Sequence, residues 1–361
     1  MKQRKNAWKQ YCREQNIEFS VRRIFIDGLS GMALGLFASL LIGTILSTLG
    51  AYLFEPVISL WGVETKLFTD ASTFTKAVQG PAMACAIGYA MQSPPFVLYS
   101  LLTVGYAANA LGGSGGPLAV WFVTVAAVFA GKLVSRRTKV DLLVTPACTI
   151  LFGVFFAALV APPIGRIGTA VGNFIMWATE QQPFVMGVLV SVVMGIVLTL
   201  PISSAAVCAS FGLTGLAGGA CVAGCCAHMV GFAVASYREN RLGGLAAQGL
   251  GTSMLQISNL MRKPVLWLPP VIASAVSGPI ATCVFGLEQN GFAIASGMGT
   301  CGLVGPIGVV VGWLQNSGGS ALDWLGLVLI CVVIPAVVSW AVSEYMRRRG
   351  IIAPGDYSLE L

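Results

Sequence analysis

Residues 28 to 54 read GLSGMALGLFASLLIGTILSTLGAYLF, and none of them carries a charge. The hydrocarbon core of a bilayer is about 30 Å thick, so a helix crosses it with roughly 20 consecutive apolar residues. This stretch therefore predicts a transmembrane helix, which ends before Glu55.

The composition of the whole chain agrees with this prediction. Hydrophobic residues make up 56% of the 361 residues and charged residues only 10%, whereas soluble proteins carry about 25% charged residues. The mean hydropathy is +0.82. We therefore expect an all-α polytopic membrane protein with about ten transmembrane helices and no large soluble domain.

Other apolar runs mark the remaining expected spans, and the run from residue 141 is expected to close at Pro162-Pro163. The runs cover residues 77–92, 95–111, 117–134, 141–164, 184–201, 265–286, 291–314 and 324–345. Residues 204–236 are too long for one untilted crossing and predict two short passes or one broken helix. Glycine and proline interrupt several runs, as at Gly112 to Pro117. Broken or re-entrant backbone at membrane depth is tolerated only where it is buried in protein or lines a cavity.

The net charge of +7 comes from basic clusters at the ends of the apolar runs. These clusters are Arg22-Arg23, Lys132 to Lys139, Arg238 to Arg241, Arg262-Lys263 and Arg347 to Arg349. The positive-inside rule places all five in the cytoplasm, together with both termini. A nucleic-acid partner is not indicated.

This topology divides the chain into three parts. We expect a basic cytoplasmic N-terminal segment at residues 1–25, a transmembrane domain at residues 26–346 and a cytoplasmic tail at residues 347–361. The N-terminal segment predicts either an amphipathic helix on the anionic leaflet or a plain basic tail.

Two motifs point to an internal repeat. AVQGPAMACAIG at residues 77–88 and AVSGPIATCVFG at residues 275–286 are identical at half of their positions. Many transporters consist of two related halves whose interrupted helices form the binding site. The alternative is that glycine-rich spans resemble one another through composition alone.

Two glycine-rich tips are also similar, GMGTCG at residues 297–302 and QGLGTS at residues 248–253. The first matches a dinucleotide fingerprint in letters only, because it lies in an apolar run without the strand that this fingerprint requires. Glycines let the backbone turn and leave amide groups free to meet a ligand. Two such tips that converge would form a polar site, and close helix packing explains either one alone.

His228 is the only histidine of the chain, and it lies in an apolar run. Ionisable groups at membrane depth usually face a cavity or a partner, so His228 is a candidate for proton relay or for recognition of a hydroxyl group. The alternative is a packing histidine with satisfied hydrogen bonds. Cys221, Cys225 and Cys226 lie nearby, but buried cysteine commonly serves as a small core residue, and we expect neither a metal nor another cofactor.

Neutral polar residues occupy the QGLGTS tip and the residues after it. Gln248, Thr252, Gln256 and Asn259 recur at a spacing that places them on one face if they belong to one continuous helix, and Ser253 lies beside them. Uncharged groups suit an uncharged, hydroxylated solute better than an ion. Hydrogen bonding between helices without a ligand is the alternative.

A charged turn precedes that stretch, with Arg238, Glu239 and Arg241. It predicts a cytoplasmic loop that holds a local ion pair. A docking surface for a soluble partner is the functional alternative.

QGLGTSMLQISNLMRKPVLWLPP at residues 248–270 resembles the signature of a family of membrane proteins similar to the EIIC subunit of the bacterial sugar phosphotransferase system, which includes regulators of the perfringolysin type. LTLPISSAA at 198–206, AHMVGFAVASYREN at 227–240 and GPAMACAIGYA at 80–90 are similar to the same family. The resemblance covers nearly the whole chain from about residue 25. Ser258 stands where the signature has proline.

The resemblance implies a multi-pass permease of the bacterial plasma membrane, in which EIIC-type dimers move a substrate-carrying part against a scaffold. It implies a sugar or similar small polar solute, and EIIA and EIIB proteins that act in trans. The chain is then at most the membrane subunit of a sugar phosphotransferase. The alternatives are a membrane sensor that regulates gene expression and an ion-coupled transporter of another solute.

Overall fold

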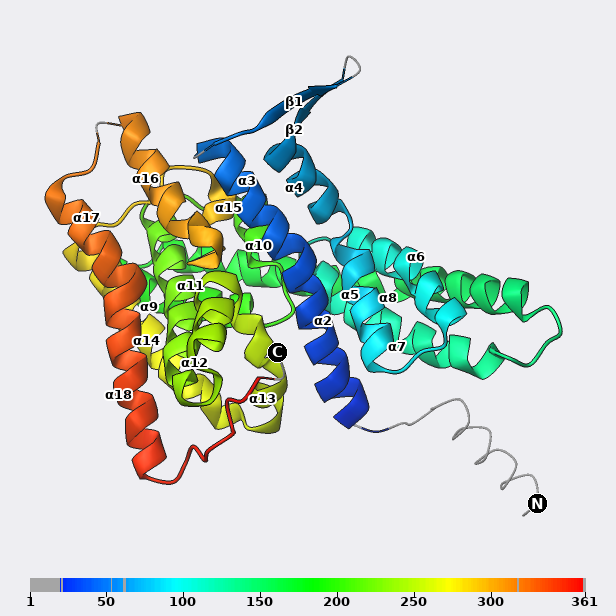
Figure 1. The fold of residues 1–361 in the computed structure, drawn as a ribbon. Coiled ribbons are helices and arrows are strands. Elements are labelled where there is room, and N and C mark those ends of the chain that lie inside the picture. Colours follow the sequence, from blue (N-terminus) through cyan, green and yellow to red (C-terminus); the bar gives the residue numbers. More distant parts are fainter. Residues whose placement is uncertain (1–19, 21, 53, 61–62, 317, 360–361) are drawn as a thin grey trace. The chain divides into compact units, whose positions relative to one another are not determined.

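The computed structural model describes residues 20, 22–52, 54–60, 63–316 and 318–359 (Figure 1). Most of the basic N-terminal segment lies outside these residues, so its two interpretations are not tested. The chain forms two compact units. Unit 1 comprises Met1–Leu40 and Thr75–Arg166, and unit 2 comprises Leu41–Phe74 and Ile167–Leu361.

Unit 1 consists of helices that approach one another closely through small residues. Its helices are η1 (Arg22–Asp27), α2 (Gly28–Leu36), α5 (Gln79–Ala90), α6 (Pro95–Gly112), α7 (Gly116–Val134) and the first part of α8 (Asp141–Thr179). A side chain at Gly80 would meet the backbone of Gly105. The chain turns at Gly113, whose φ of +51° favours glycine. The predicted break between two apolar runs at this point is confirmed.

Unit 2 begins with helix α3 (Ile42–Tyr52) and a small hairpin of strands β1 (Val57–Leu60) and β2 (Val63–Lys66), followed by α4 (Leu67–Ala77). The strands pair antiparallel, with Val57 opposite Lys66. The Glu55 side chain accepts hydrogen bonds from the N–H groups of Phe68 and Thr69. These bonds satisfy free donors in the first turn of α4.

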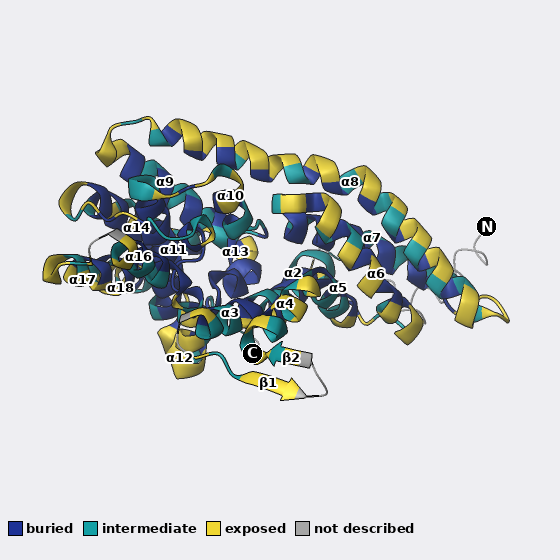
Figure 2. Ribbon diagram, turned by 90° about the horizontal axis from the view of Figure 1, so that it is seen from above, coloured by how far each residue is buried: buried dark blue, intermediate teal, exposed yellow. Residues whose placement is uncertain are grey.

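The rest of unit 2 is built around one buried helix, α11 (Gly215–Ala235). The other helices are α9 (Pro183–Thr199), α10 (Ser204–Phe211), α12 (Tyr237–Ala246), α13 (Ile257–Arg262), α14 (Leu268–Pro279), α15 (Ala293–Ser296), α16 (Val304–Asn316), α17 (Ala321–Val328) and α18 (Ile334–Arg348). Helix α11 packs against α9, α14 and α18 and is buried along most of its length (Figure 2). Glycines allow this packing, because a side chain at Gly224 would meet the backbone of Ser191 on α9.

Three expectations about continuous helices are wrong. The run 291–314 is broken between α15 and α16, where Gly299 and Gly302 adopt positive φ angles of +52°. Residues 248–259 do not form one helix, because Thr252 is extended with φ of −155°. It separates the π-helical turn η4 (Ala247–Gly251) from the 3-10 turn η5 (Ser253–Gln256) and from α13. The third wrong expectation is that the helix from residue 141 ends at Pro162-Pro163.

Helix α8 continues to Thr179 instead of ending at the expected prolines. It contains Pro146, Pro162 and Pro163. Proline is tolerated inside transmembrane helices because neighbouring groups satisfy the carbonyl that loses its donor. The residues after Arg166 extend the helix to Thr179. No local feature of the sequence indicates that the helix continues through these prolines.

Residues 204–236 form the short helix α10 and the longer α11, separated at Gly212, whose φ is +60°. Among the described residues, six helical stretches are long and apolar enough to cross a membrane. They are Arg22–Ala51, Pro95–Val134, Asp141–Thr179, Gly215–Ala235, Pro264–Val284 and Ala321–Arg348. Pro183–Thr199 and Cys301–Gln315 are shorter apolar helices. The protein is an all-α polytopic membrane protein, and the number of about ten crossings stays a prediction.

Candidate functional site

His228 lies at the centre of unit 2 and is fully buried on α11. Its Nδ1 atom is 3.1 Å from Oγ1 of Thr199, the last residue of α9. The same Oγ1 atom is 2.8 Å from Oγ of Ser253. Three elements, α9, α11 and η5, therefore meet at one hydrogen-bonded group of polar side chains.

The other ring nitrogen of His228 has no hydrogen-bond partner among the described residues. Thr199 Oγ1 also lies 3.1 Å from the Gly195 carbonyl, to which it can donate its single proton. With that assignment Nδ1 of His228 is the protonated nitrogen and Nε2 is an acceptor. A buried acceptor without a donor costs free energy, so Nε2 is the natural partner of a hydroxyl group from outside the chain.

Aromatic rings enclose the histidine. The ring centroids of Phe232 and Trp267 both lie 5.9 Å from that of His228. Phe232 in turn lies 6.3 Å from the ring of Tyr357. This wall combines apolar faces with few polar atoms, as in many sites for small molecules.

A chain of carboxamides extends the polar layer away from His228. Gln256 Nε2 donates to Gln248 Oε1 at 2.9 Å, and Asn259 Nδ2 donates to Gln256 Oε1 at 2.8 Å. Gln248 Nε2 donates to Ser236 Oγ at 2.8 Å. All of these side chains are buried. The three amides that the sequence singled out are thus brought together by a broken backbone, and their contact with a solute stays a prediction.

The two glycine-rich tips lie next to each other. Thr300 Oγ1 donates to the Gly249 carbonyl at 2.5 Å. A side chain at Gly299 would meet the backbone of Cys225 on α11. The hydroxyl group of the buried Thr252 accepts a hydrogen bond from the Met254 N–H at 3.2 Å. Glycine therefore lets both tips lie against the buried helix that carries His228.

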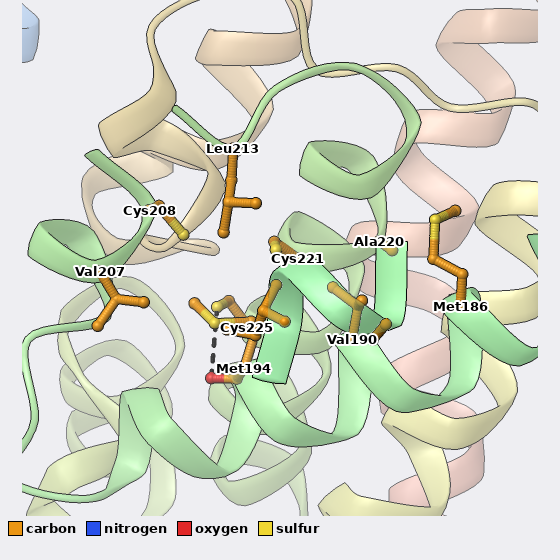
Figure 3. Close-up of a cluster of buried hydrophobic side chains, with 11 residues drawn as sticks. Met186, Val190, Met194, Val207, Cys208, Leu213, Ala220, Cys221 and Cys225 are labelled. Carbon is orange, nitrogen blue, oxygen red and sulfur yellow. Dashed lines mark hydrogen bonds between the residues drawn. The ribbon is translucent and has the colours of Figure 1, made fainter. Parts of the chain in front are cut away.

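The nearby cysteines lie in an apolar core. Cys208, Cys221 and Cys225 are buried among Val190, Met194 and Leu213, and Cys225 Sγ is 3.8 Å from the Met194 carbonyl (Figure 3). In the part of the chain that the structure describes, no group of three or more His, Cys, Asp or Glu side chains is arranged to hold a metal ion. The position of Cys208, Cys221 and Cys225 among apolar side chains favours a packing role for these cysteines.

The charged turn forms helix α12 and is tied to α18. Glu239 pairs with Arg347, and Arg238 pairs with Glu344 at 2.8 Å. The expected ion pair within the turn is therefore replaced by pairs with α18, which is about a hundred residues away in the sequence. Helix α18 carries the complementary charges Glu344 and Arg347 near its end. Docking of a soluble partner on Arg238, Glu239 and Arg241 stays a prediction.

Sequence reasoning missed several residues of this layer. Thr199 lies in the LTLPISSAA motif and Asn240 in the charged turn, and the sequence alone assigns neither of them a role in the site. Tyr357 was assigned to a cytoplasmic tail, although it is fully buried. A large aromatic ring next to Asp356 and close to the apolar pair Ile351-Ile352 was the available signal.

The fold and this buried layer define a polytopic membrane protein with a polar centre. The chain belongs to the family described as Phosphotransferase system, EIIC, whose model matches residues 26–359. It is therefore a membrane permease component of a phosphotransferase system, a class that takes sugar substrates and works with EIIA and EIIB partners. No curated protein matches the chain.

Proposed function

We propose that unit 2 binds a sugar or a similar small hydroxylated solute at His228 and passes it across the bacterial plasma membrane through a gated site. The observation that carries this proposal is the unpartnered Nε2 atom of His228. Thr199 holds the ring through Nδ1 and is itself bound to Ser253. An acceptor in an aromatic enclosure suits the hydroxyl group of a sugar.

The remaining contacts come from the carboxamide chain and its neighbours. Gln248, Gln256 and Asn259 offer donors and acceptors, as do the hydroxyl groups of Thr252 and Ser253. We propose that the chain acts as a homodimer with both termini in the cytoplasm. Phosphorylation of the solute then requires EIIA and EIIB in trans, with Arg238, Glu239 and Arg241 as their candidate contact.

Purified protein is used to test first binding and then transport. A thermal-shift screen against sugars, sugar acids, nucleosides and organic anions identifies the solute, because a ligand of the native state raises its stability. Flux is then measured in proteoliposomes. We expect His228→Leu to weaken binding about tenfold, the effect of one lost hydrogen bond of about 1.4 kcal/mol.

Ser277→Ala is the matched control, because Ser277 Oγ is also buried and without a hydrogen-bond partner in the described chain. It should leave solute affinity unchanged. Equal affinities of His228→Leu and the unaltered protein would exclude His228 from the site. Binding without flux would favour a sensor, and flux that follows a proton or sodium gradient would favour ion-coupled transport.

A further inference from the structure

The segment Gly350–Leu359, which follows α18, folds back onto unit 2 (Figure 1). Its two apolar anchors are Ile352, 2% exposed, and Tyr357, fully buried. Both lie in a core cluster with Phe232, Leu260 and Leu266. Between the anchors, Ala353, Pro354 and Gly355 are exposed. The segment is therefore anchored to unit 2 at two apolar side chains, and the exposed residues between them form a turn.

Carboxamide side chains hold the main chain of the segment. Asn240 Nδ2 donates to the Tyr357 carbonyl at 2.8 Å, and the Leu359 N–H donates to Asn240 Oδ1 at 2.9 Å. Gln256 Nε2 donates to the same carbonyl at 3.1 Å. Asn259 Nδ2 donates to the Ser358 carbonyl at 2.9 Å. Hydrogen bonds to the main chain combined with pockets for selected side chains are a common means of binding a peptide. Here the bound segment turns, because the Asp356 N–H donates to the Ala353 carbonyl at 3.2 Å and the Ser358 N–H donates to the Gly355 carbonyl at 3.0 Å.

Two adjacent side chains of the segment have partners of their own. The Tyr357 hydroxyl donates to the Leu266 carbonyl at 2.9 Å, and the Arg347 guanidinium lies 5.9 Å from its ring centroid. Lys263 Nζ binds Asp356 Oδ2 at 2.6 Å. A buried aromatic anchor beside a charge pair is the pattern of a binding hot spot. The surface thus recognises an Asp-Tyr pair in a chain that turns at residues 354–357.

We infer that this surface is a peptide-docking site occupied by the chain's own segment Gly350–Leu359, and that release of the segment makes the carboxamide layer available to the solute. Docked, the Tyr357 and Ser358 carbonyls occupy donors of Gln256 and Asn259. The same donors are two of the proposed solute contacts, so segment and solute compete for them. This regulatory role rests on the proposed function, whereas the docking site does not.

The competition sets the apparent affinity for the solute. Only the released fraction of the protein offers the donors, and the apparent affinity falls in proportion to that fraction. A change that weakens docking without touching a proposed solute contact should therefore strengthen solute binding. Asn240 and Tyr357 are suitable positions, because both hold the segment and neither is a proposed solute contact.

The test compares the full-length protein with Tyr357→Ala, Asn240→Ala and the control Tyr345→Ala. Tyr345 is 56% exposed on α18, so its removal should have no effect on docking. Hydrogen exchange of residues 350–359 is expected to be at least about tenfold faster in the first two variants. A labelled peptide GIIAPGDYSL should bind Tyr357→Ala at least about tenfold more tightly than the unaltered protein, whose site is occupied.

Solute affinity, measured on the same proteins, should rise at least about fivefold in Tyr357→Ala and Asn240→Ala. Unchanged exchange in both variants, or a peptide that fails to bind Tyr357→Ala, would overturn the docking site. Faster exchange with unchanged solute affinity would overturn its regulatory role. If no variant bound any solute, the proposed function would fail, while exchange and peptide binding would still decide the docking site.

Discussion

Arg347 binds Glu239 through two parallel hydrogen bonds, from Nη1 to Oε1 at 2.8 Å and from Nη2 to Oε2 at 2.9 Å. The side chains are only 10% and 8% exposed. Arg347 Nη2 also donates to the Ala235 carbonyl at 2.9 Å. This pair joins the end of α18 to the end of α11 and the start of α12, next to the docked segment.

Glu239→Gln should destabilise the protein, because it leaves the Arg347 charge buried without its counter-ion. Breaking a buried pair costs about 3 kcal/mol. Glu344→Gln is the control, since Glu344 pairs with the 64% exposed side chain of Arg238; exposed pairs contribute about 1 kcal/mol or less. Unfolding in detergent measures both, and equal losses would contradict the special role of the Arg347–Glu239 pair.

Gly224→Ala should destabilise the contact between α11 and α9. A side chain at this position would meet the Ser191 carbonyl and force the helices apart, and such overpacking costs about 1–3 kcal/mol. At Gly243, on α12, no atom lies within 4 Å of an added Cβ. Gly243→Ala should therefore stabilise the helix by about 0.5–1 kcal/mol. The prediction fails if both substitutions shift the unfolding temperature in the same direction.

Thr199→Val should destabilise more than Thr149→Val. Both threonines are buried and lie close enough to donate to the carbonyl four residues earlier, at 3.1 Å and 2.8 Å respectively. Thr199 also contacts His228 and Ser253, which lose a partner in Thr199→Val. We expect a loss of about 1–3 kcal/mol for Thr199→Val and of about 1 kcal/mol or less for the control. Equal unfolding temperatures would show that the hydroxyl group does not organise the site.

Docking of the segment Gly350–Leu359 should weaken in acid. Burial by itself raises the pKa of Asp356, but the Lys263 hydrogen bond, the Ala353 N–H and the charges of Lys263 and Arg347 outweigh it. The pKa of the docked carboxyl group therefore lies below its ordinary value of 3.8. Protons bind preferentially to the undocked segment, so docking is fully stabilised above about pH 5 and is progressively lost below about pH 4.

A fluorotyrosine at position 357 reports this transition by NMR, because its ring passes from the core to water. Asp356→Asn removes the titrating group and should abolish the part of the transition that belongs to Asp356. Glu239 lies near Tyr357 and can contribute separately. An unchanged pH profile in Asp356→Asn would assign the transition to another group.

The sequence predicted the helical breaks best where glycine or proline acts locally. Gly113 and Gly212 end helices through their own backbone conformations, and Pro95 and Pro183 begin helices at their first positions. Pro162 lies inside α8 and does not end it. Whether a proline ends a transmembrane helix depends on neighbouring groups in space, which the local sequence does not specify.

The sequence pointed to some members of the polar layer and not to their arrangement. Gln248, Gln256 and Asn259 were expected on one helical face, yet they meet because Thr252 breaks the helix. Their shared hydrogen bonds depend on that break and on Tyr357, about a hundred residues away. Spacing rules describe only a continuous helix, so they could not place these groups.

The sequence by itself determined that this chain crosses a membrane, because its uncharged apolar runs are long enough to span the hydrocarbon core as helices. It also pointed to His228, Gln248 and Gln256 as polar groups within or beside apolar runs, and all three are buried. The tertiary structure alone decided which of these groups are satisfied by the chain. In the packed structure Nε2 of His228 has no partner among the described residues, whereas the Tyr357 carbonyl accepts a hydrogen bond from Gln256. Which polar groups are paired depends on residues far apart in the sequence, and these come together only when the helices pack.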